Sequence, residues 1–217
     1  MARPTLIIAN RNYSSWSMRA WLAMKATGAD FDEVVVPLGR DDTAEAIHRW
    51  SPSGRVPALN DGALTIWDSL AICEHLAERF PDAGLWPADP GARAIARSVV
   101  AEMHSSFTAL RSHMTMNLRA SRPGAGRGPG VDDDVRRIAE IWDGCRRDFG
   151  AGGRLLFGSF TIADAFYAPV VSRFVTYGVE LDGPARDYLE AVWALPAVRE
   201  WADAARAETW TVARYET

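Results

Sequence analysis

The stretch that decides the fold is "TLIIANRNYSSWSMRAW", residues 5–21. Its first five residues are apolar and typical of a short buried strand, and residues 15–28 continue as a helical pattern that stops at Gly28. Three serines stand where the strand gives way to the helix: Ser14, Ser15 and Ser17. Serine is a favoured N-cap residue, so this stretch alone favours a helix cap. A hydroxyl here could also hold a ligand, and the rest of the chain bears on that choice.

The remainder of the first half alternates between strand and helix patterns. Four further elements are predicted: a strand over 31–38, a helix over 41–50, a hairpin over 51–67 and an amphipathic helix over 68–80. Asp41 and Asp42 suit the positive end of the second helix, and Asn60, Asp61 and Gly62 suit the hairpin turn. The order β-α-β-α-β-β-α predicts a small mixed sheet with helical crossovers.

Composition changes at residues 81–91, "PDAGLWPADPG", where prolines and glycines interrupt all periodicity. Beyond this stretch almost everything follows a helical pattern, so we expect a domain boundary here. The stretch 121–130, "SRPGAGRGPG", predicts a connection between helices. Its arginines could touch an acidic partner, but a solvated loop is the preferred interpretation.

Bulk composition narrows the class of protein. The 217 residues are 48% apolar and 24% charged with a net charge of −4, which predicts a globular chain that attracts no nucleic acid. Cys73 and Cys145 lack a second Cys or His at metal-ligand spacing, so we expect neither a disulfide framework nor a bound metal. The N-terminal apolar run is too short for a signal peptide and no stretch reaches membrane-spanning length. We therefore expect a cytoplasmic protein with no membrane partner.

Three short motifs in the first half could form one binding site. The serine turn follows the first strand, at the edge of an α/β sheet where ligands commonly settle. The Val56-Pro57 bond opens a strand, where it is either an ordinary trans bond or a cis bond that turns the Val56 backbone towards an extended peptide. In the context "GRVPAL" we expect it to be cis. Asp68-Ser69 begins a helix; the pair either caps that helix or receives a carboxylate and an amine. Together they predict a site for a small thiol peptide.

At this point the sequence resembles a known family. The stretches "NYSSWSMRAWLAM", "GRVPAL", "DSLAICEHLAERFP" and "FTIADAFYAPVV" are similar to the glutathione S-transferases, and the serine pair resembles their zeta-like members. The resemblance implies an α/β thioredoxin-like domain over 1–83 that binds glutathione. It also implies an all-helical domain over 91–217 that supplies most of the second-substrate pocket, and a homodimer.

The resemblance assigns roles to individual residues. It places the thiol-activating hydroxyl at Ser14, with Ser15 as the fallback. It places Val56 against the cysteinyl backbone of glutathione with Arg55 beside it, and Asp68 and Ser69 at the γ-glutamyl end. Trp16 stands where zeta members have Cys, which argues against zeta-type isomerisation and mixed-disulfide chemistry.

Two features of the second half bear on stability and specificity. Thr161 to Asp164 is a capping-box variant and is assigned a structural role. In "AEMHSSFTALRSHMTMN" we expect one helix whose apolar stripe, formed by Met103, Phe107, Leu110 and Met114, packs in the core. His104 and Arg111 would then lie near one face, where they either orient a substrate or meet solvent. The resemblance places this helix at the second-substrate pocket, whose candidate residues are Met103, His104, Phe107 and Arg111.

The function predicted is glutathione transfer: the site activates the thiol of glutathione, its co-substrate, as a thiolate that attacks a small electrophile. One alternative is glutathione-dependent isomerisation, dehalogenation or peroxide reduction at the same site. Another is a non-catalytic protein that reuses the fold for binding. The intact serine turn, Val56-Pro57 and Asp68-Ser69 favour an enzyme.

Overall fold

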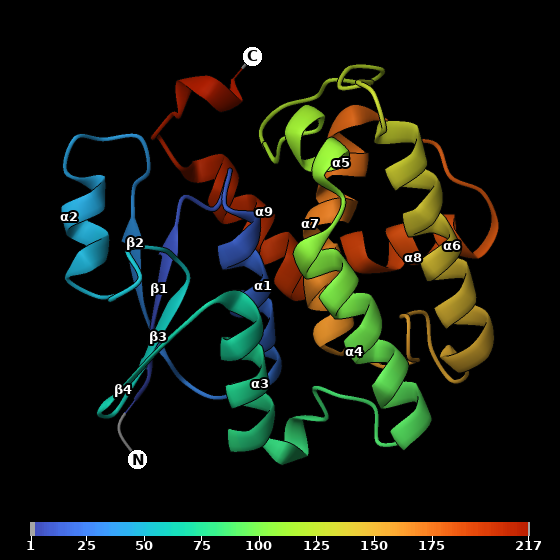
Figure 1. The fold of residues 1–217 in the computed structure, drawn as a ribbon, viewed down its shortest axis with the longest axis horizontal. Helices are drawn as coiled ribbons and strands as arrows, with labels where there is room; N and C mark the ends of the chain where they lie inside the picture. Colours follow the sequence, from blue (N-terminus) through green and yellow to red (C-terminus); the bar gives the residue numbers. More distant parts are fainter. Residues whose placement is uncertain (1–2, 217) are drawn as a thin grey trace.

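The N-terminal half is a four-stranded sheet with helices on both faces, as the computed structural model of the chain shows for the described residues 3–216 (Figure 1). Its elements are β1 (Thr5–Ala9), α1 (Ser15–Ala26), β2 (Asp32–Val36), α2 (Thr43–His48), β3 (Ala58–Asp61), β4 (Leu64–Trp67) and α3 (Ser69–Arg79). The strands lie in the order β2-β1-β3-β4; β1 pairs parallel with β2, and the other pairs are antiparallel. The predicted order of elements is confirmed.

Alternation along β1 explains why helices cover both faces of the sheet. Leu6 and Ile8 belong to the main core, while Ile7 belongs to a smaller cluster with Val36 and Ile47 of α2. Successive side chains of a strand point to opposite faces, so the apolar run at 5–9 needs cover on each side. In Figure 1, α2 lies on one side of the sheet, and α1 and α3 lie on the other.

The C-terminal half is helical. Its elements are η1 (Pro81–Ala83), α4 (Pro90–Ser105), α5 (Thr108–His113), α6 (Val131–Phe149), α7 (Ile162–Tyr177), α8 (Gly183–Trp193), α9 (Pro196–Ala207) and η2 (Ala213–Tyr215). Helix α7 is buried along almost its whole length and packs against α1 and α4. One continuous core runs from β1 to α9, so the two halves share their interior.

The predicted capping box at the start of α7 is present. One carboxylate oxygen of Asp164 accepts from the Thr161 backbone N–H at 2.8 Å and from the Thr161 hydroxyl at 3.1 Å. The other oxygen accepts from the Leu156 backbone N–H at 3.2 Å. Asp164 is fully buried, and burial raises its pKa to about 6. It therefore fixes the first turn of the central helix, the structural role assigned to it.

The prediction of one continuous helix over residues 101–117 is wrong. Helix α4 ends at Ser105 and α5 begins at Thr108, with Phe107 between them at φ 61°. The Arg111 guanidinium donates to the carbonyls of Met103 and His104, which satisfies acceptors that a helix end leaves free. The expected burial nevertheless holds, because Met103, Phe107, Leu110 and Met114 all lie in the core.

Among residues 3–216, no helix is both long enough and apolar enough to cross a membrane.

Candidate active site

A cavity of about 750 Å³ lies where the sheet meets the start of α1 and of α3. Five of its lining residues are among those expected at the glutathione site: Ser14, Arg55, Val56, Asp68 and Ser69. They come from three separate stretches of the chain, and the fold brings them to one hollow. Ser15, the fallback hydroxyl, is not part of the lining.

Ser14 has two structural roles: it is the N-cap of α1, and it lines the cavity. Its Oγ accepts from the Ser17 backbone N–H at 3.3 Å and donates to the Ser17 hydroxyl at 2.8 Å. Ser17 Oγ in turn accepts from the Ala9 backbone N–H at 3.0 Å. Ser14 therefore caps the helix, and Ser17 ties the first turn of the helix back to β1. Cap and ligand contact are thus compatible roles for one hydroxyl.

The Val56-Pro57 peptide bond is cis, as predicted. Val56, Pro57 and the exposed Arg55 all line the cavity immediately before β3. The Arg55 backbone N–H donates to the Ser53 hydroxyl at 3.2 Å.

Asp68 and Ser69 start α3 and differ in how their side chains are used. Asp68 has a left-handed backbone, φ 75°, and its carboxylate caps the helix by accepting from the Leu70 N–H at 2.8 Å and the Ala71 N–H at 3.4 Å. Ser69 is buried, and its hydroxyl has no hydrogen-bond partner in the described part of the chain. Buried polar atoms in folded proteins nearly always have a partner, so an orphaned hydroxyl on a cavity wall suits a ligand acceptor. The cap interpretation holds for Asp68 but does not account for Ser69.

Behind the cavity wall lies a basic cluster, formed by Arg19 and Arg111 around Trp16. The guanidinium carbons of Arg19 and Arg111 lie 4.5 Å and 5.1 Å from the centre of the Trp16 ring. Arg19 is buried, and its Nε and one Nη lack a hydrogen-bond partner within residues 3–216. Burial, followed by repulsion from Arg111, holds the pKa of Arg19 well below its usual value. A positive potential from this cluster favours an anion nearby.

His104 lies between this cluster and the start of α3. Its Nε2 is 3.4 Å from Asp68 Oδ2, and its ring meets Trp16 edge-on with the ring centres 5.2 Å apart. Burial lowers the pKa of His104 although the Asp68 carboxylate opposes that shift. The imidazole thus makes a polar contact with the Asp68 carboxylate at the start of α3.

The four residues expected at the second-substrate pocket do not line the cavity. Met103 and Phe107 are core residues, exposed by only 1% and 5%. His104 and Arg111 meet behind Trp16, although the broken helix removes the common helical face that was expected of them. Core packing thus accounts for the two apolar residues, and the polar pair lies next to the site.

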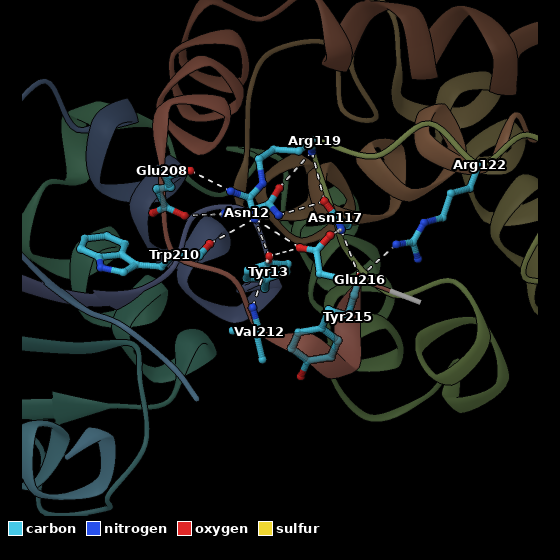
Figure 2. Close-up of polar contacts among 10 residues, drawn as sticks. All are labelled: Asn12, Tyr13, Asn117, Arg119, Arg122, Glu208, Trp210, Val212, Tyr215 and Glu216. Carbon is cyan, nitrogen blue, oxygen red and sulfur yellow. Dashed lines mark hydrogen bonds and ion pairs between the residues drawn. The ribbon is translucent and has the colours of Figure 1, made fainter. Parts of the chain in front are cut away.

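Several site residues escaped the sequence analysis. Trp67 and Tyr215 line the cavity, as does Tyr13, whose hydroxyl contacts Arg119 and Glu216 (Figure 2). Arg19 could have been identified from the sequence, because it is a charged residue inside the apolar pattern of α1. No local signal indicates Tyr215, which lies far along the chain from the serine turn.

The cysteines are free and buried. Burial raises the pKa of Cys145 to about 12 and that of Cys73 further above its usual value, so neither thiol ionises at neutral pH.

Within residues 3–216, no group of three or more His, Cys, Asp or Glu side chains could hold a metal ion.

Comparison with known proteins identifies the class. The models of the glutathione S-transferase N-terminal and C-terminal domains match residues 13–79 and 93–204. A maleylacetoacetate isomerase of Pseudomonas aeruginosa is 32% identical over 91% of this chain and 88% of that protein. The match to the Rattus norvegicus maleylacetoacetate isomerase is 38% identical but spans 45% of each chain. A crystal structure of a glutathione transferase homologue from Burkholderia, with bound glutathione, is 27% identical; the match covers 95% of this chain and 100% of that chain, with a TM-score of 0.72.

An α/β N-terminal half followed by a helical C-terminal half is the architecture that the two matching domain models describe. The chain belongs to the glutathione S-transferase family. The resemblance drawn from the sequence motifs is confirmed.

Proposed function

We propose that the chain is a glutathione transferase that ionises the glutathione thiol and adds it to a small electrophile. The observation that carries the proposal is the convergence of Ser14, Val56 and Ser69 on one cavity in a chain of this family. In this proposal residues 1–83 bind glutathione, and residues 91–217 supply most of the pocket for the electrophile.

Binding of glutathione uses the two sides of the cavity. The backbone of Val56 pairs with the cysteinyl unit of the peptide, and Arg55 lies beside it. The orphaned Ser69 hydroxyl donates to the γ-glutamyl carboxylate at the start of α3, where backbone N–H groups also favour an anion. Asp68, whose carboxylate is partly exposed, faces the γ-glutamyl amine.

Activation of the thiol rests on Ser14. A free cysteinyl thiol has a pKa near 8.5, so roughly 3% is thiolate at pH 7, and the thiolate is the nucleophile. When sulfur is bound, the Ser14 hydroxyl turns its proton to the sulfur, and the Ser17 hydroxyl donates to Ser14 in its place. The Ala9 N–H supports that chain from behind, and the basic cluster adds a positive potential. Tyr13 is not proposed for this role, because its hydroxyl is engaged with Arg119 and Glu216.

A glutathione-dependent isomerase on the same site is the second candidate, since a relative that aligns with 91% of this chain is a maleylacetoacetate isomerase. The basic cluster would suit an anionic substrate. Trp16 in place of the zeta-type Cys favours transfer over isomerisation. Dehalogenase or peroxidase activity would use the same thiolate.

Assembly and location complete the proposal. The edge strand β4 presents Leu64 with 58% of its surface exposed, and an open sheet edge offers unpaired backbone groups to another chain. We propose that this edge contributes to a homodimer. The free, buried Cys73 and Cys145 suit the reducing cytoplasm.

Two measurements test the function. Retention on immobilised glutathione separates a glutathione-binding protein from a chain that only shares the fold. Turnover of a chlorinated nitroaromatic with glutathione then separates a transferase from a non-catalytic binder, and turnover of maleylacetoacetate tests the isomerase. Retention without turnover of any electrophile, peroxide or isomerisation substrate would leave only the binding protein.

A further inference from the structure

A segment that follows α9, residues 208–216, returns to the turn between β1 and α1 (Figure 2). We call it the strap. At its start the Glu208 carboxylate accepts from the backbone N–H groups of Arg11 and Asn12 at 2.7 Å and 3.1 Å. Near its end Tyr215 lines the same cavity as Ser14. The strap thus joins the wall of the site to the turn that carries Ser14.

Arg119, in the connection after α5, holds the strap at several points. Its guanidinium donates to the carbonyls of Glu208 at 2.7 Å and Trp210 at 3.1 Å, and to the Glu216 carboxylate at 3.2 Å. The same guanidinium donates to the Tyr13 hydroxyl. A planar guanidinium offers five donors in fixed directions, which a more flexible cation would not reproduce.

Neighbouring contacts fix the last part of the strap. The Asn117 side-chain amide donates to the Tyr215 carbonyl at 3.1 Å, and the Tyr13 hydroxyl donates to the Glu216 carboxylate. These bonds hold the backbone of Tyr215 and leave its ring to be placed by packing. The ring stacks on Tyr13 with centres 5.5 Å apart and an angle of 29° between planes, and the Arg214 guanidinium carbon lies 4.7 Å from the ring centre.

The cavity wall is rich in flat aromatic surface, to which the strap adds the Tyr215 ring. Tyr13, Trp16, Trp67 and Tyr215 all line it. Aromatic rings favour offset-stacked or edge-on partners, so such a wall discriminates in favour of planar, unsaturated molecules over small alkyl ones.

We propose that Tyr215 is a binding residue for the second substrate, that it selects planar unsaturated electrophiles, and that Arg119 is the positioning residue that holds it there. The inference rests on the proposed glutathione-transferase function and assigns the selectivity of that site to the strap. Arg119 acts through the strap and through Tyr13, on which the Tyr215 ring stacks, and Arg119 itself does not line the cavity.

The first test substitutes the ring. The probes are a chlorinated nitroaromatic and iodoethane, each with glutathione, and the readout is the ratio of their kcat/KM values. Tyr215→Ala should lower this ratio about 3- to 10-fold, mainly by raising KM for the nitroaromatic, which is the size expected for one lost aromatic contact. Tyr215→Phe keeps the ring and should keep the ratio. A ratio unchanged in Tyr215→Ala, or lost equally in Tyr215→Phe, would overturn the role given to the ring.

The second test separates positioning from general destabilisation. Arg119→Met should lower the ratio in the wild-type background but have little further effect in a Tyr215→Ala background, because both changes remove the same contact. Arg206→Met is the matched control: Arg206 lies on α9, and its guanidinium pairs with Asp203 at 2.8 Å. Within residues 3–216 its guanidinium forms no hydrogen bond or ion pair with the strap. It should leave the ratio unchanged. Additive losses for Arg119→Met and Tyr215→Ala would overturn the positioning role.

Failure of the inference and failure of the proposed function are distinguishable. If the unmodified protein turns over neither probe and is not retained on glutathione, the proposed function fails. If it turns over both probes and the ratio does not respond to Tyr215→Ala, only the inference fails.

Discussion

Replacing Ser14 with alanine tests the proposed chemistry directly. In the proposed mechanism the hydroxyl stabilises the thiolate, so its loss should raise the pKa of bound glutathione towards the free value. One hydrogen bond to a charged group contributes about 1.5–3 kcal/mol, which corresponds to roughly one to two pKa units. At pH 7 kcat/KM should therefore fall about ten- to thirtyfold. At pH 9, where the thiol ionises unaided, the loss should be a few-fold at most.

The structure also sets the cost to folding. Ser14 Oγ caps α1 through a long 3.3 Å contact with the Ser17 N–H, and Ser17 Oγ keeps its bond from Ala9 in the variant. The free energy of unfolding should therefore fall by only about 0.5–1 kcal/mol. The melting temperature should drop slightly, and the fold should survive.

The assay is a pH series of kcat/KM for Ser14→Ala, Ser15→Ala and Ser17→Ala, each with its melting temperature. Ser15→Ala is the matched control, because this hydroxyl is one residue away and lies outside the cavity lining. Ser17→Ala should give a smaller shift, since Ser17 acts only through Ser14. A shift in Ser15→Ala with none in Ser14→Ala would mean that the wrong serine was chosen. No shift in any variant would make the turn purely structural and end the catalytic proposal.

Three further changes test other parts of the account. Ser69→Ala should weaken glutathione binding in calorimetry by about 1.5–3 kcal/mol with little change in kcat; unchanged affinity would return Ser69 to a structural role. Asp164→Ala leaves two buried backbone N–H groups without acceptors, so the free energy of unfolding in urea should fall by about 2–5 kcal/mol. The exposed Asp187→Ala should change it by less than about 0.5 kcal/mol, and equal effects would refute the capping argument. Leu64→Arg should shift the mass measured by light scattering from dimer to monomer, whereas a persistent dimer would place the interface elsewhere.

Local sequence patterns determined the order of elements and pointed to five of the residues that line the cavity. Periodicity and turn residues identify β1 to α3, because strand alternation and helix caps depend on neighbours in sequence. Periodicity failed around Phe107: its apolar stripe is buried, but the helix breaks there. At the break, the Arg111 side chain takes up the carbonyls at the end of α4, a contact that helical periodicity does not encode.

Only the tertiary structure decided which residues share the cavity. The sequence indicated Ser14, Val56 and Ser69 one by one, but that the Ser69 hydroxyl is orphaned depends on everything packed around it. Tyr215 reaches the site because Arg119 and Asn117, about a hundred residues earlier, hold the strap against the turn at residues 10–14. Hydrogen bonds between segments so far apart leave no periodic trace in either segment. Local propensity therefore specified the elements, and long-range packing specified which residues form the cavity wall.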